Sequence, residues 1–129
     1  MDQIQNNSKI FRVSSLLEFN RLKKGKFFRS DTLWFKYILD NENDSPFKLS
    51  VAVSKKYGNA VKRNLIKRRI KNAFYMLSDS QNIPRNFIVM IGVDRDVTSE
   101  ISFEQIYDSV EKFLAEISKF NFLKGDLSQ

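Results

Sequence analysis

The sequence contains no cysteine and no histidine, and only two prolines among 129 residues. Without cysteine the chain forms no disulfide and no thiolate metal site, which agrees with a reducing compartment. Without histidine it lacks the commonest general base near neutral pH and the commonest metal ligand. No apolar run approaches the ~20 residues that a membrane span requires. We therefore expect a folded cytoplasmic protein that does not enter a membrane.

Positive charge is concentrated in one part of the chain. The net charge is +7, yet no acidic residue occurs between Asp44 and Asp79. Of the 22 Lys and Arg residues, 13 lie elsewhere, against 15 acidic residues. A positive field confined to one region is typical of a protein that binds a polyanion. The nine basic residues of this region are Lys48, Lys55, Lys56, Lys62, Arg63, Lys67, Arg68, Arg69 and Lys71.

Two capping boxes predict helices near the two ends of the chain. Ser15 is followed three residues later by Glu18, which predicts a helix to about Lys24, ended by Gly25 in a left-handed conformation. Ser102 and Gln105 form the second box, ahead of the clearest amphipathic pattern in the chain. The apolar positions of that pattern are Phe103, Ile106, Tyr107, Val110, Phe113, Leu114 and Ile117.

Three segments are predicted to be strands. Residues 32–39 are aromatic and β-branched, residues 40–46 form a turn cluster, and residues 47–54 alternate, which predicts an antiparallel hairpin. Residues 27–30 give a weaker prediction of a short extra strand. Residues 87–93 form a nearly continuous apolar run, which is typical of a strand buried on both faces.

The order of these elements indicates one α+β domain, with helices against a mostly antiparallel sheet. We expect a flexible N-terminal tail over residues 1–10, a folded domain over 11–122 and a C-terminal tail over 123–129.

A further helix is predicted from an Asn59 cap to about Leu77, with one apolar stripe at Ile66, Ile70, Ala73, Phe74 and Leu77. At about 100° per residue, a set of polar residues points away from this stripe. Asn64, Arg68 and Lys71 lie almost opposite the stripe, Lys67 lies at its border, and Leu65 and Arg69 lie beside them.

The cations and the amide of this helix form a ridge at one-turn spacing. Guanidinium groups can contact phosphates in bidentate fashion, and ammonium groups act as point charges. A solvated charged face is the alternative, but such faces normally alternate in sign and gain from i,i+4 pairs. Because this ridge has no acidic partner in sequence, nucleic-acid contact is favoured. Composition does not distinguish RNA from DNA.

The residues around this ridge resemble a known family signature. Residues 51–74 read Val-Ala-Val-Ser-Lys-Lys-Tyr-Gly-Asn-Ala-Val-Lys-Arg-Asn-Leu-Ile-Lys-Arg-Arg-Ile-Lys-Asn-Ala-Phe. This stretch is similar to the bacterial ribonuclease P protein family in its Lys-Lys step, its Gly-Asn-Ala turn and its Arg-Asn-Arg helix. Weaker similarity covers most of the chain.

The resemblance implies a fold and a function. The fold would be α-β-β-β-α-β-α, with a mostly antiparallel four-stranded sheet and a left-handed βαβ crossover, as in the ribosomal protein S5 domain 2-like class. The function would be that of the protein subunit of ribonuclease P, an endoribonuclease whose catalysis resides in its RNA. The partners would be ribonuclease P RNA and precursor tRNA, without a small-molecule cofactor. Mg²⁺ would be bound mainly by the partner RNA, and the protein would supply no catalytic residue.

The resemblance also implies the site residues. A cleft between the first helix and the sheet would hold the 5′ leader of precursor tRNA through Phe19 and Tyr37, since aromatic faces stack on any base. Core packing is the alternative for both rings. The expected contacts to the catalytic RNA are Lys55, Lys56, Arg63, Asn64, Lys67, Arg68, Arg69 and Lys71.

Two positions depart from the family pattern. Leu65 replaces the last arginine of Arg-Asn-Arg, and we hypothesise that Arg69, one turn later, supplies the missing charge. Lys23 stands where the family often has a second aromatic residue in the first helix, so leader contact there would be electrostatic.

Other functions fit less well. A protein nuclease would need Asp94, Asp96 and Glu100 to hold Mg²⁺, but loop solvation and favourable charge ahead of the final helix are the favoured explanation of these residues. A structural RNA-binding protein of ribosomal type would use the same charge and fold class. A helix-turn-helix is disfavoured because the basic helix follows a strand.

Overall fold

The structure is a computed structural model that describes residues 10–13, 15–39, 47–80, 86–94, 97 and 100–127, with only the backbone described at 79–80 and 120–127. No helix in these residues is long and apolar enough to cross a membrane. The elements are β1 Ile10–Arg12, α2 Leu16–Leu22, β2 Lys26–Ser30, β3 Leu33–Leu39, β4 Phe47–Ala52, the 3-10 turn η1 Lys55–Tyr57, α3 Ala60–Ser80, β5 Phe87–Val93 and α4 Phe103–Leu127.

The described strands form a single mixed sheet in the order β1-β4-β5-β3-β2. β1 runs parallel to β4 and β4 runs parallel to β5, whereas β3 runs antiparallel to both β5 and β2. The predicted four-stranded, mostly antiparallel sheet was therefore wrong in both strand number and direction. The additional strand is β1, which the tail prediction overlapped at Ile10. β4, α3 and β5 form the expected βαβ unit, whose handedness stays a prediction.

The predicted hairpin between residues 32–39 and 47–54 was also wrong. β3 and β4 both exist, but β5 lies between them and pairs with each. The physical reason is burial: β5 is apolar on both faces, so it is most stable at the centre of the sheet. The true hairpin joins β2 to β3, through a turn in which Asp31 has a φ of 55°. The weaker prediction of a strand near residues 27–30 is thereby confirmed.

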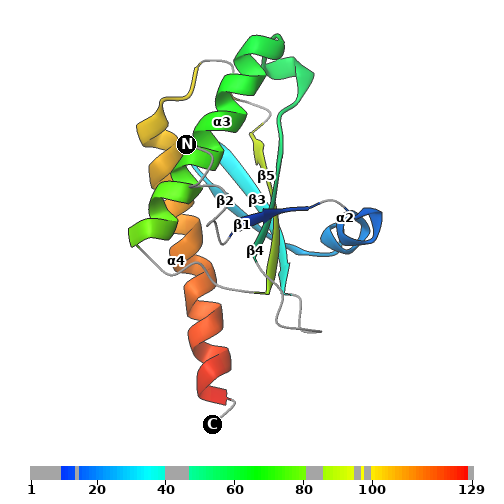
Figure 1. The fold of residues 1–129 in the computed structure, drawn as a ribbon, viewed down its shortest axis with the longest axis vertical. Coiled ribbons are helices and arrows are strands. Elements are labelled where there is room, and N and C mark those ends of the chain that lie inside the picture. Colours follow the sequence, from blue (N-terminus) through cyan, green and yellow to red (C-terminus); the bar gives the residue numbers. More distant parts are fainter. Residues whose placement is uncertain are drawn as a thin grey trace.

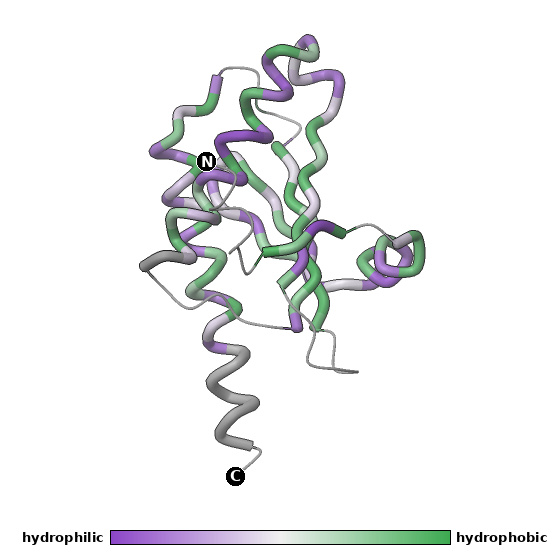
Figure 2. The backbone as a smooth tube through the Cα atoms, in the orientation of Figure 1, coloured by the Kyte–Doolittle hydropathy of each residue, from purple (hydrophilic) through white to green (hydrophobic). Residues whose placement is uncertain are grey.

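Helices cover the two faces of the sheet unequally (Figure 1). α3 and α4 pack together against one face, and α2 lies against the other. The predicted apolar stripe of α3 is confirmed, because Ile66, Ile70, Ala73, Phe74 and Leu77 are at most 1% exposed. Figure 2 shows hydrophilic residues recurring along α3 between these hydrophobic ones.

The predicted helix caps are confirmed. The Ser15 hydroxyl accepts from the Glu18 N–H at 3.1 Å, and the Asn59 side chain accepts from the Lys62 N–H at 3.0 Å. Ser102 and Gln105 exchange both bonds of a capping box. Each side-chain acceptor satisfies an N–H that the helix itself leaves unbonded.

Gly25 does not take the predicted left-handed conformation. Glycine fits this position for a different reason, because a Cβ would lie 2.5 Å from the carbonyl oxygen of Tyr37. The chain after α2 therefore runs directly against β3. The expected N-terminal tail lies outside the described residues except for Ile10, and α4 continues to Leu127.

Candidate nucleic-acid interface

The basic ridge lies on the outward side of α3, as its spacing predicts. Asn64, Arg68 and Lys71 are exposed and Lys67 is half-buried, while the stripe opposite them packs on the sheet. Lys55 and Lys56 are exposed in η1, immediately before the helix. The structure thus places these predicted contacts on one continuous run from η1 into α3.

Arg63 is oriented by the turn that precedes its helix. Its Nε donates to the carbonyl oxygen of Gly58 at 3.2 Å, and the side chain is half-buried. This bond leaves the terminal nitrogens of the guanidinium available for a further acceptor. The Gly58-Asn59 turn therefore positions Arg63 and starts α3 at the same time.

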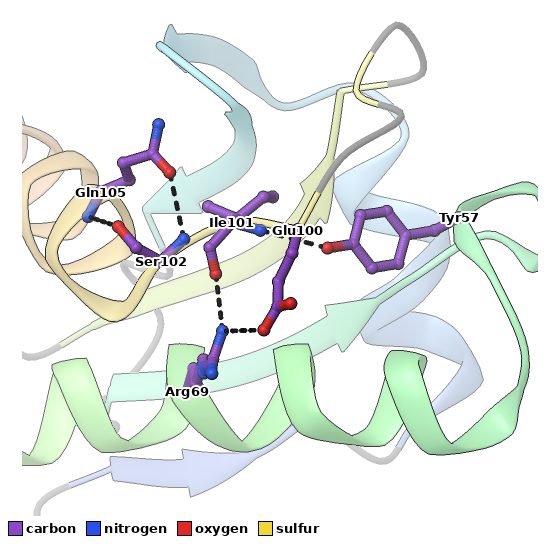
Figure 3. A network of polar contacts seen from close by, with 6 residues as sticks. All are labelled: Tyr57, Arg69, Glu100, Ile101, Ser102 and Gln105. Carbon is purple, nitrogen blue, oxygen red and sulfur yellow. Dashed lines mark hydrogen bonds and ion pairs between the residues drawn. The ribbon is translucent and has the colours of Figure 1, made fainter.

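Arg69 has partners within the protein (Figure 3). Its Nη1 donates to the carbonyl oxygen of Ile101 at 2.7 Å and lies 3.3 Å from a carboxylate oxygen of Glu100. The Ile101 N–H in turn donates to the hydroxyl of Tyr57 at 3.3 Å. Arg69 and Tyr57 therefore hold the segment that leads into α4. The hypothesis that Arg69 replaces the charge missing at Leu65 stays a prediction, and 26% of its side chain is accessible.

Phe19 and Tyr37 are not brought together. Tyr37 is only 6% exposed and packs against Phe87 and Phe113 in the main core. Phe19 packs on the other face of the sheet, in a small cluster with Val13, Leu22 and Ile88. Burial, and to a lesser degree the nearby Glu116, raises the pKa of Tyr37 above its ordinary value of 10.0. Its role in leader contact stays a prediction, but little of the ring remains for a base.

The face of the sheet that carries α2 also bears two aromatic rings that we call the aromatic platform, Phe27 and Trp34. Their centroids lie 6.2 Å apart with an interplanar angle of 17°, and Phe27 is 56% exposed. The Trp34 indole lies directly over Gly92, where a Cβ would come within 2.1 Å of the ring. Glycine at this position lets the ring lie flat on the sheet.

The aromatic platform borders a cavity of about 580 Å³, which Arg29, Lys36 and Lys56 also line. Arg29 pairs with Asp94 at 3.4 Å, and its guanidinium carbon is 6.0 Å from the centre of the Phe27 ring. The site residues predicted from the sequence do not include this group. The alternation of β3 was the available signal, because Trp34 and Lys36 must face away from the buried Leu33, Phe35 and Tyr37.

Of the three acidic residues considered for a protein nuclease, the structure describes Asp94 and Glu100. Asp94 pairs with Arg29, Glu100 pairs with Arg69, and Asp96 lies outside the described residues. Across the part of the chain that the structure describes, no three His, Cys, Asp or Glu side chains are grouped to hold a metal ion. The described part of the chain therefore offers no cluster of oxygen ligands of the kind that a divalent cation prefers.

The sequence that forms this sheet and the basic helix α3 matches a family of known proteins. The family model for Ribonuclease P matches residues 8–118. The chain belongs to the ribonuclease P protein family. The ribonuclease P protein component of Staphylococcus carnosus is 32% identical over 114 residues, which cover 88% of this chain and 95% of the relative. The component from Mesomycoplasma hyopneumoniae strain 7448 is 40% identical over 73 residues, 57% of this chain, and the match spans 64% of that relative's length.

Solved structures of ribonuclease P proteins share the fold. The Staphylococcus aureus protein superposes with a TM-score of 0.68 at 28% identity, covering 84% of this chain and 95% of that one. The Thermotoga maritima protein gives 0.66 at 20% identity, covering 80% and 94%. At that identity the second likeness supports the fold alone.

Proposed function

We propose that this chain is the protein subunit of ribonuclease P, which binds the catalytic RNA and the 5′ leader of precursor tRNA. It would support Mg²⁺-dependent endonucleolytic removal of the leader in the cytoplasm, leaving the mature 5′ end of the tRNA. The observation that carries the proposal is the family match over residues 8–118, joined to a basic face of α3 that has no acidic residue in its sequence interval. Catalysis would reside in the RNA, so no side chain is assigned a catalytic role.

The basic face would act by neutralising phosphate charge. Each phosphate contact releases counterions, which makes the affinity strong at low salt and steeply salt-dependent. The guanidinium groups of arginines can bind a phosphate through two parallel hydrogen bonds, which orients it, and lysines add positive charge. The ridge would therefore fix the position of the RNA along α3. The residues proposed for this contact remain Lys55, Lys56, Arg63, Asn64, Lys67, Arg68, Arg69 and Lys71.

The leader would lie over the aromatic platform as well as near Phe19. Single strands bind to surfaces that combine exposed aromatic faces with cations along the backbone path. Phe27 and Trp34 supply the faces, and Lys36 and Lys56 supply the cations at the same cavity. Stacking is worth ~1–3 kcal/mol per base and does not depend on which base is present. Lys23, exposed at the end of α2, would add an electrostatic contact.

Mg²⁺ would be held mainly by the partner RNA. Among the described residues no three carboxylates are grouped to hold the ion, which agrees with this assignment. What the protein would contribute is affinity for the substrate, preference for precursor over product, and a lowered demand for metal through its own positive charge.

Reconstitution tests the proposal directly. Purified protein is mixed with a bacterial ribonuclease P RNA and a precursor tRNA at near-physiological Mg²⁺, and each component is also assayed alone. We expect leader removal when protein and RNA are combined and no cleavage by the protein alone. Cleavage by the protein alone would contradict the proposal and direct attention to Asp94. RNA binding without stimulated cleavage would favour a structural RNA-binding protein of ribosomal type.

The position of the leader can be followed through Trp34, because the chain has one tryptophan. We expect a single-stranded leader oligonucleotide to quench its fluorescence, and Phe27→Ala to weaken this binding about tenfold, since one stacked base is worth ~1–3 kcal/mol. Met76→Ala, which removes a side chain of similar exposure (52%) from α3, is the matched control and should bind normally. Equal affinities for both variants would remove the aromatic platform from the proposed leader site.

A further inference from the structure

A second groove lies between the edge strand β1 and the outward side of α3. Its volume is about 490 Å³, and its walls come from β1 and α3, with Leu49 of β4 between them. Ile10 and Arg12 line it from β1, while Arg68, Lys71 and Tyr75 line it from α3. The helix residues are spaced at i, i+3 and i+7, so they lie on one side of α3 and face the strand together.

The groove combines an apolar interior with a cationic rim. Ile10 is half-buried and Leu49 is buried, whereas Arg12, Arg68 and Lys71 are exposed. Among the described residues no ion pair engages these three cations, and no acidic side chain lines the groove. Positive charge thus stands on both walls of a cavity whose volume falls within the roughly 300–1,000 Å³ typical of small-molecule sites.

We infer that this groove receives an unpaired nucleotide of the RNA partner. The base would stack on Tyr75, the flanking phosphates would contact Arg12 and Arg68 from opposite walls, and the exposed amide of Asn72 could bond a base edge. The inference rests on the proposed function, because the same RNA would lie along the ridge on α3. It adds a second wall to that interface, and it adds an aromatic contact that a ridge of cations does not supply.

Edge protection is the simpler account of Arg12 alone. Charged side chains on an edge strand discourage pairing with other chains. That account explains neither the cavity between the strand and the helix nor the alignment of Tyr75 with Arg68 and Lys71. A continuous RNA duplex would also fit poorly, because its bases stay paired and stacked inside the helix and so do not offer a free face to Tyr75. The combination of apolar interior, aromatic wall and cations on two sides favours a splayed nucleotide.

The test measures affinity for a bacterial ribonuclease P RNA and for a fully paired RNA duplex, each at several salt concentrations. We expect Arg12→Ala to weaken binding to the ribonuclease P RNA and to lower its salt slope by about one unit. Tyr75→Leu, which keeps an apolar body without an aromatic face, should weaken that binding about tenfold with an unchanged salt slope. Tyr75→Phe should bind within about twofold of the wild type, since the ring is retained. Binding to the duplex should not respond to either change at Tyr75.

Thermal unfolding of each variant, together with Lys112→Ala on α4 as the control, separates loss of folding from loss of contact. If Arg68→Ala weakens RNA binding but Arg12→Ala and Tyr75→Leu do not, the groove is not part of the interface, while the proposed function stands. If Arg12→Ala matters and Tyr75→Leu does not, the wall is electrostatic and the inserted nucleotide is ruled out. If none of the three changes has an effect, the RNA interface proposed on α3 fails as well.

Discussion

The guanidinium of Arg69 joins two segments that are far apart in the sequence. It reaches from α3 to the carbonyl of Ile101, at the entrance to α4, and the pair with Glu100 reinforces this contact. The segment is held from the other side by the Tyr57 hydroxyl. A residue that the family resemblance led us to predict as an RNA contact thus positions the last helix.

Replacing Arg69 by alanine should destabilise the fold. We expect Arg69→Ala to lower the free energy of unfolding by about 1–3 kcal/mol, because the Ile101 carbonyl loses its donor. Glu100→Gln should change it by less than about 1 kcal/mol, because an ion pair to a carboxylate that is 69% exposed contributes little. Urea unfolding of both variants measures the difference.

Arg68→Ala is the matched comparison on the same helix, since its side chain is exposed. It should leave the urea midpoint unchanged and weaken RNA binding. If Arg69→Ala leaves RNA affinity untouched where the variant is fully folded, Arg69 does not replace the charge missing at Leu65.

Burial of the Tyr37 phenol makes stability depend on alkaline pH. Its pKa is raised in the folded state, so above pH 10 the unfolded chain loses this proton first and the folded state becomes less favoured. Stability from this group is therefore complete below its ordinary pKa and is lost as pH rises through the raised one. Tyr37→Phe should lose less free energy of unfolding than the wild type between about pH 9 and 11, a range set by the ordinary tyrosine pKa. Parallel curves for the two proteins would contradict the assignment.

At the scale of elements, α3 begins where a turn, a cap and the basic sequence meet. The Asn59 side chain bonds the Lys62 N–H, and the Arg63 side chain bonds back to the Gly58 carbonyl. The first turn of the helix has no acidic residue to offset the positive end of the helix dipole. Its start therefore depends on the Asn59 cap more than is usual.

Removing this cap should loosen the basic helix. We expect Asn59→Ala to cost about 1 kcal/mol of unfolding free energy, and Asn59→Ser to restore most of it because serine also caps well. Hydrogen exchange at Lys62 and Arg63 should quicken in the alanine variant only. Equal exchange in both variants would show that the adjoining turn, rather than the cap, holds the start of α3.

Across the whole molecule, the lysines of α4 and the basic residues on the outward side of α3 lie in different charge environments. Lysines on α4 pair with acidic neighbours on the same helix, Lys112 with Asp108 and Lys119 with Glu116. Those on the outward side of α3 have no such neighbours in sequence. A net charge of +7 thus acts mainly through one surface, which would steer an RNA toward α3.

This separation predicts a position-dependent salt effect. Replacing both Arg68 and Lys71 by glutamine should lower the slope of log affinity against log salt for RNA by about two units. Replacing both Lys112 and Lys119 by glutamine removes the same charge from α4 and should leave the slope nearly unchanged. Filter binding across a salt series measures both slopes. Equal changes in the two double variants would mean that net charge, rather than the α3 surface, governs binding.

Sequence patterns predicted the elements well because their causes are local. The stripe of α3, the caps at Ser15, Asn59 and Ser102, and the two-sided burial of β5 each depend on residues within a few positions of one another. The resemblance over residues 51–74 was specific for the same reason, since strand, turn and helix are contiguous there. The structure confirms these elements, and the family match confirms the resemblance.

The sequence by itself therefore determined the helices, the central strand, the concentrated positive charge and the family. Only the tertiary structure decided that β5 separates β3 from β4, that Tyr37 faces the core while Trp34 faces outward, and that Arg69 reaches Ile101. The physical reason is that strand alternation shows which side chains share a face without showing which face is buried. That choice depends on pairing between segments distant in the chain, where the burial of apolar area outweighs local preference.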